Sequence, residues 1–176
     1  SSPYELTTNV NSRYGVFYAS VLPNLFEIRR QINEKADKDN YKKATAITYV
    51  LQVLHGLKVT HLNGSIPYKQ AMAGRYEGNF SPAFDSQEEL FTTWLAELNS
   101  AIADLSAANT ASTVSFGNSD IYYKSDWTKW IKLANTLKLR IAARYENENN
   151  TKTSDIVKEV LANAVGPIQS AEDNLA

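Results

Sequence analysis

The sequence predicts an all-α protein of helical hairpins, arranged in a tetratricopeptide-like array with long loops. Apolar residues recur every three to four positions over four long stretches, which is the spacing of helices with one buried face. Short polar turns and longer loops alternate between these stretches, so neighbouring helices can pack antiparallel. The consensus residues of the tetratricopeptide repeat are missing, so the likeness to that repeat is one of shape.

Composition sets the outer bounds. The chain has 176 residues, about one domain, and 43 % of them are hydrophobic, enough for a core. The net charge of -1 gives no argument for binding nucleic acid or anionic lipid. There is no cysteine, which excludes disulfides, thiolate metal sites and a lipidation cysteine within the chain. No signal peptide is visible, and no apolar run approaches the roughly 20 residues of a membrane span.

The first two helices are expected at 12–35 and 41–62, joined by a charged turn. Pro23 interrupts the first pattern and predicts a kink or break near Leu22, because proline lacks an N–H and clashes with the preceding turn. The apolar stripe of the first helix is Phe17, Val21, Leu25, Ile28 and Ile32. The stripe of the second is Ile47, Val50, Leu51, Leu54 and Leu57. Gly64 and Pro67 end the second helix.

A third helix is expected at 86–105, after a long loop over 63–84 of the kind that often carries function. Asp85 or Ser86 can cap its first N–H groups, and Glu88 or Glu89 can complete a capping box. Its apolar stripe is Phe91, Trp94, Leu95, Leu98, Ile102 and Leu105.

Residues 106–125 are rich in Ser, Thr, Ala and Asn and predict a loop. A fourth helix follows at 127–146 and a shorter fifth at 154–164, ended by Gly166 and Pro167. The buried face of the fourth helix is expected to hold Trp127, Trp130, Ile131, Ala134, Leu137 and Ile141. Residues 168–176 show no stop signal, so we expect residues 1–176 to be one helical domain of a longer chain.

Two blocks of sequence carry a family resemblance. The first joins residues 61–71 (HLNGSIPYKQA) to a helix start at 82–91 (PAFDSQEELF), and the second joins 117–126 (GNSDIYYKSD) to 130–142 (WIKLANTLKLRIA). The order of the two blocks and their residues resemble the SusD/RagB family of outer-membrane nutrient-binding lipoproteins. Members usually read Tyr-Gly-Asp-Val-Pro-Tyr in the first block and Trp-x-Lys-Phe-Ala-Asn-Ser-Leu-Arg-Leu-Arg in the second.

The resemblance covers about residues 45–145, and three positions depart from it. Asn63 stands where the family usually has Tyr, Ser65 where it has Asp, and Ser125 where it commonly has Gly. These changes weaken the turn signatures and leave the helix signature intact. The family is considerably longer than this chain, so the chain resembles a repeat-bearing part of a SusD-like protein.

The resemblance implies a function without catalysis and without a cofactor. Members sit lipid-anchored on the outer surface of Gram-negative bacteria and capture oligosaccharides or related nutrients for a SusC-type TonB-dependent transporter. Their helical repeats largely form the scaffold and the transporter contact, while glycans bind on loops. The alternative is a helical-repeat scaffold that binds a partner protein and no sugar, since many repeat arrays do so through a concave face.

Candidate glycan contacts follow from side chains that suit sugars, namely rings for stacking with amides and charges beside them. They are Arg75, Tyr76, Asn79, Phe80, Phe84, Tyr122, Tyr123 and Trp127. The loop rings could instead pin the loop to the helices. Both segments lead into the N-termini of consecutive helices, so we expect them to emerge on the same side.

Other notable side chains have simpler structural explanations. Trp94 and Trp130 lie at helical spacing and are expected in the core. Asn135 and Arg140 belong to the family's helix signature, and we expect a buried amide and a paired guanidinium that fix helix packing rather than ligand contacts.

Catalysis and metal binding find little support in the sequence. Asp120 and Asp126 could form a glycosidase pair, but helix capping and turn formation explain both. His55 and His61 are six residues apart, which is the wrong spacing for one helical face, and no third ligand is visible. No metal site and no catalytic residue is predicted.

Overall fold

The computed structural model describes residues 20–63, 86–114, 126–145 and 150–170. In these ranges the chain forms five α-helices and one 3-10 turn, with no β-strand, as the sequence predicts. The elements are α2 (Leu22–Asn33), η2 (Lys38–Tyr41), α3 (Lys42–Asn63), α5 (Gln87–Ser106), α6 (Trp127–Tyr145) and α7 (Asn150–Ala162).

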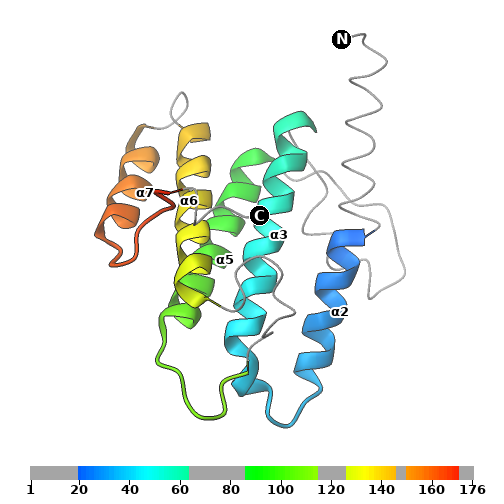
Figure 1. Cartoon of the computed structure of the whole chain (residues 1–176). Helices are drawn as coiled ribbons and strands as arrows, with labels where there is room; N and C mark the ends of the chain where they lie inside the picture. The colour runs from blue at the N-terminus through cyan, green and yellow to red at the C-terminus, as the bar shows by residue number, and fades with distance from the viewer. Residues whose placement is uncertain (1–19, 64–85, 115–125, 146–149, 171–176) are drawn as a thin grey trace.

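Successive helices run up and down through the bundle (Figure 1). Lys43 at the start of α3 donates to the carbonyl of Leu105 at the end of α5 over 3.0 Å, so these helices are antiparallel. Phe91 near the start of α5 packs edge-on against Tyr145 at the end of α6, with ring centroids 5.4 Å apart. The predicted hairpin arrangement is confirmed.

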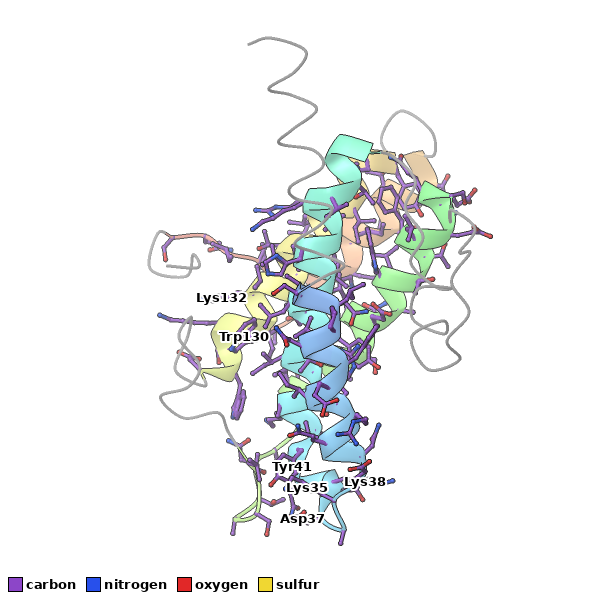
Figure 2. All side chains as sticks on the ribbon, turned by 90° about the vertical axis from the view of Figure 1, so that its right-hand side faces the viewer. Lys35, Asp37, Lys38, Tyr41, Trp130 and Lys132 are labelled. Atoms are coloured by element: carbon purple, nitrogen blue, oxygen red, sulfur yellow. The ribbon has the colours of Figure 1, made fainter. Side chains whose placement is uncertain are left out.

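The start of α2 agrees with the break expected at proline. The helix begins at Leu22 and places Pro23 in its first turn, where the missing N–H removes no helical hydrogen bond. Residues 12–19 of the expected first helix lie outside the described residues. The charged turn that follows lies at the lower end of the bundle in Figure 2, where the ammonium of Lys35 sits 5.3 Å from the ring centre of Tyr41.

The interface between α2 and α3 contains a buried arginine. Arg29 donates to Thr48 Oγ1 over 3.0 Å and to Gln52 Oε1 over 2.6 Å. Its guanidinium also lies 5.2 Å from the ring centre of Phe26 and 4.2 Å from that of Tyr49. We call these five residues the arginine seam.

The predicted stripe of α2 is wrong at one position. Ile28 is 36 % exposed, whereas Arg29 is buried together with Leu25 and Ile32. The buried stripe also includes Leu22, so it follows helical spacing with the arginine in the place expected for isoleucine.

The apolar core lies between α3, α5, α6 and α7, and Leu22 and Phe26 of α2 pack into it. Trp94, Trp130, Leu137 and Ile141 are fully buried, which confirms the prediction for all four. Further members of this core include Val50, Val53, Leu57, Leu90, Leu98, Leu105, Leu133, Ile156 and Val160. Gly56 on α3 lets the helices approach closely, because a Cβ there would lie 2.7 Å from Cζ2 of Trp94.

The start of α5 carries the expected capping box. Ser86 Oγ accepts a hydrogen bond from the Glu89 N–H over 3.2 Å, and the Ser86 N–H donates to the Glu89 carboxylate over 3.1 Å. Ser86, rather than Asp85, is the N-cap. Two otherwise unpaired N–H groups are therefore satisfied within four residues.

Helix α7 starts at Asn150, four residues earlier than predicted. The prediction placed its first turn outside the helix because residues 150–153 are polar. Contacts to neighbouring helices support this turn: Thr153 donates to the carbonyl of Ala142 over 3.0 Å, and Lys152 pairs with Glu88 of α5 over 2.7 Å. No helix in the described ranges is long and apolar enough to cross a membrane.

Candidate functional site

Most of the predicted glycan contacts fall in segments that the structure does not describe. Arg75, Tyr76, Asn79, Phe80, Phe84, Tyr122 and Tyr123 lie outside the described residues. The eighth, Trp127, is the first residue of α6.

Trp127 is half-buried and packs against the edge of the apolar core. The ammonium of Lys43 lies 5.5 Å from the centre of one of its rings, a cation–π distance. The preceding residue, Asp126, accepts the N–H groups of Thr128 over 3.1 Å and Lys129 over 3.3 Å. Asp126 is therefore the predicted helix cap, and Trp127 keeps part of its surface open to solvent.

The helix starts that lead from the two candidate segments do not lie together. Because α5 and α6 are antiparallel, Ser86 and Trp127 lie at opposite ends of the helix pair (Figure 1). A helix of 20 residues is about 30 Å long. The helix starts therefore give no support to a common side for the two segments, and the segments themselves lie outside the described residues.

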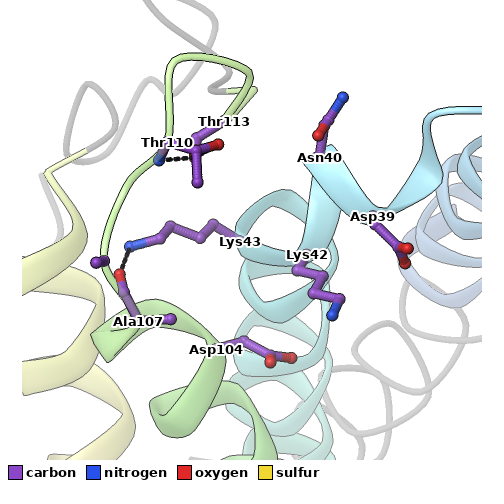
Figure 3. Close-up of a pocket in the computed structure, with 9 residues that line it drawn as sticks. Asp39, Asn40, Lys42, Lys43, Asp104, Ala107, Thr110 and Thr113 are labelled. Carbon is purple, nitrogen blue, oxygen red and sulfur yellow. Dashed lines mark hydrogen bonds between the residues drawn. The ribbon is translucent and has the colours of Figure 1, made fainter.

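An open pocket of about 210 Å³ lies at the end of the bundle where α3 begins and α5 ends (Figure 3). We call it the α3–α5 pocket. Its lining residues are Asp39, Asn40, Lys42, Lys43, Asp104, Ala107, Ala108, Thr110 and Thr113. Lys43 connects it to Trp127, because the same ammonium borders the pocket and the indole ring.

Lys43 forms the inner wall of this pocket. It is buried, and its ammonium donates to the carbonyls of Leu105 over 3.0 Å and Ala107 over 2.6 Å. The last turn of α5 contains no basic residue, so Lys43 supplies from α3 the positive charge that suits a helix C-terminus. Burial lowers the pKa of the Lys43 ammonium.

The outer wall is a short loop held in place by hydrogen bonds. The Val114 N–H donates to the carbonyl of Asn40 over 2.9 Å, which ties residues 107–114 to η2. Within the loop, the Thr110 N–H donates to Thr113 Oγ1 over 2.8 Å. Both walls are therefore fixed by hydrogen bonds between distant parts of the chain.

Besides Lys43, the described residues that line the pocket include one lysine and two aspartates. Lys42 and Asp104 project toward the same opening in Figure 3, and Asp39 lies nearby on η2. Among the described residues, none of these three forms an ion pair. The pocket was not predicted, although one signal was available: α3 begins with Lys42 and Lys43 and has no acid in its first turn, contrary to the usual preference.

The two signature residues of α6 differ in how the described part of the chain bears on them. Asn135 is buried, and its Nδ2 donates to Asn163 Oδ1 over 3.1 Å and to the Gly166 carbonyl over 3.0 Å. It therefore fixes the turn after α7, as a structural amide should. Arg140 is exposed rather than packed between helices, and no described residue pairs with its guanidinium.

Comparison with known proteins gives a consistent picture. The family model described as SusD-like, Susd and RagB outer membrane lipoprotein, matches residues 2–176. A solved chitin-binding protein is similar at 24 % identity with a TM-score of 0.77, over 94 % of this chain and 33 % of that one. No curated protein matches the chain significantly.

Two further solved structures are similar in the same way. A chitin-binding SusD homolog from Flavobacterium johnsoniae is 27 % identical with a TM-score of 0.76, over 92 % of this chain and 32 % of that one. A SusD-like protein from Bacteroides thetaiotaomicron is 26 % identical with a TM-score of 0.73, over 94 % and 32 %. The chain spans about a third of the length of these structures. Since the family model covers nearly its whole length, this chain belongs to the SusD/RagB family of outer-membrane lipoproteins.

Proposed function

We propose that the chain takes part in the non-catalytic capture of extracellular oligosaccharide for import with a SusC-type TonB-dependent transporter. The observation that carries the proposal is the family match over residues 2–176. Two similar solved structures are described as chitin-binding, which makes oligomers of N-acetylglucosamine the first ligands to test. The protein acts at the outer surface of the outer membrane, where its family is found.

The glycan contacts belong, in this proposal, to the 75–84 loop and to Tyr122, Tyr123 and Trp127. Trp127 supports it physically, since a partly open indole at the edge of a rigid core can stack on a sugar ring. The cap role of Asp126 supports the absence of catalysis, because both of its contacts hold the helix start.

The binding experiment titrates the chain with triacetylchitotriose and a panel of other oligosaccharides while tryptophan fluorescence and amide chemical shifts are followed. We expect saturable, weak binding that changes little with moderate salt, because stacking and neutral hydrogen bonds do not depend on counterions. Chromatography of the sugar after incubation should show no cleavage.

The alternative, a protein-binding scaffold without sugar affinity, is an outcome of the same experiment. If no oligosaccharide in the panel shifts any resonance and the chain still co-purifies with the transporter, the sugar-capture proposal fails and the scaffold is favoured. If binding is accompanied by cleavage, the non-catalytic part fails.

A further inference from the structure

We infer that the α3–α5 pocket is a subsite for one neutral sugar residue, distinct from the loop contacts proposed above. The inference rests on the proposed function, because it concerns how an oligosaccharide would be held. It starts from a preformed cavity whose walls come from three parts of the chain, η2 with α3, the end of α5, and the loop 107–114.

The pocket is rigid, which lowers the entropy cost of binding. Lys43 ties the start of α3 to the end of α5 through two carbonyls, and Val114 ties the loop to Asn40. None of these bonds has to break for a ligand to enter. The backbone that carries the groups facing the opening is therefore held in place before binding.

The polar groups of the pocket match a neutral ligand better than an ion. Asp39 and Asp104 supply acceptors, and Lys42 supplies donors. With Lys43 included, the described lining residues carry two carboxylates and two ammonium groups, so their formal charges cancel and favour neither an anion nor a cation. A ring carrying several hydroxyl groups offers donors and acceptors to both kinds of side chain.

Size and lining limit the ligand further. A volume of about 210 Å³ is below the 300–1,000 Å³ typical of pockets for drug-sized molecules, so a single ring is the appropriate size. None of the described residues that line the pocket is aromatic, so these residues can hold a sugar ring by hydrogen bonds to its hydroxyl groups. The Lys43 ammonium lies 5.5 Å from the centre of a Trp127 ring, so the indole is a near neighbour of the pocket.

The test compares the 176-residue chain with Asp104→Ala during titration with triacetylchitotriose, followed by amide chemical shifts. Asp104 is half-buried and makes no ion pair with a described residue, so the variant should fold normally, which thermal unfolding checks. Loss of a hydrogen bond to a charged group should weaken binding about tenfold. The matched control is Asp155→Ala, which removes an exposed carboxylate from α7 and should bind like the wild type.

The outcomes separate the two proposals. Shifts at Lys42, Asp104 and Thr110, together with weaker binding by Asp104→Ala alone, support the subsite. Unchanged affinity in that variant, with wild-type shifts confined to other residues, overturns the subsite and leaves sugar capture standing. No binding to any sugar overturns both. Larger shifts with phosphate or calcium chloride than with the sugar would show that the ligand class is wrong.

Discussion

Two regions of the bundle are held together by different interactions. In the apolar core, Trp94 and Trp130 are fully buried among aliphatic side chains, and stability comes from apolar area removed from water. In the arginine seam, a buried guanidinium binds two neutral side chains of α3 and lies between two aromatic rings. The core gains from each buried atom, whereas the seam must first offset the cost of burying a charge. Mutations should therefore act very differently in the two regions.

The largest effect is expected in the core. Trp130→Ala should lower the free energy of unfolding by about 3–5 kcal/mol, because it removes a fully buried indole and leaves a cavity. Denaturant unfolding measures this change. The matched control, Trp127→Ala, removes a half-buried ring and should cost clearly less. Equal costs for the two variants would mean that the core is not centred where the structure places it.

In the arginine seam, the effect of replacing Arg29 on the free energy of unfolding should depend on whether Gln52 is replaced as well. Arg29→Met should cost about 1–3 kcal/mol, since Gln52 Oε1 loses a charged donor in a buried place. The double variant Arg29→Met/Gln52→Leu should recover most of this loss, because replacing both polar partners by apolar groups is often nearly neutral. A double variant at least as unstable as the sum of the single ones would contradict the description of the seam as an electrostatic compromise.

A smaller effect is expected where α3 meets the core. Gly56→Ala would place a Cβ 2.7 Å from the buried indole of Trp94, which must then shift. Overpacking outweighs the gain in helix propensity and gives a net cost of about 1–2 kcal/mol. Combining it with Trp94→Phe should cost less than the sum of the two changes, because the smaller ring makes room. Additive costs would indicate that the two residues do not touch.

The smallest effect is a pH dependence from His55 on α3. Burial, followed by the charge of Lys58, lowers the pKa of this imidazole below its ordinary 6.5. The unfolded chain then binds the proton more readily than the folded one, so stability is fully present above pH 6.5 and falls as the pH drops through the lower folded value. Unfolding curves between pH 7 and 5 should show a steeper loss for the wild type than for His55→Gln. Parallel curves would rule out this contribution.

Local patterns predicted much of the fold. The spacing of apolar residues located α3, α5 and α6 to within a residue or two at each end, and the Ser86 capping box was visible as a short motif. The structural role of Asn135 also followed from its place beside an apolar face. The glycan contacts assigned to residues 75–84, Tyr122 and Tyr123 remain predictions, since they lie outside the described residues.

The errors at Ile28 and at the start of α7 have a common physical cause. Ile28 was assigned to the buried stripe of α2 because it is apolar, whereas packing against Thr48 and Gln52 selected Arg29. The start of α7 reads as a polar turn, yet contacts with α5 and α6 support it as helix. In each case a polar side chain finds a partner on another helix, which the residues beside it in sequence do not reveal.

The sequence alone determined the class of fold, the helices and most of their buried faces, because helical periodicity is set by residues three and four positions apart. The two motif blocks, within residues 61–91 and 117–142, also indicated the SusD/RagB family. Tertiary structure decided the arginine seam and the α3–α5 pocket. Lys43 meets the carbonyls of Leu105 and Ala107 across 62 and 64 residues of sequence. Only the antiparallel packing of α3 on α5 brings these groups together, so the basic start of α3 could not by itself locate the pocket.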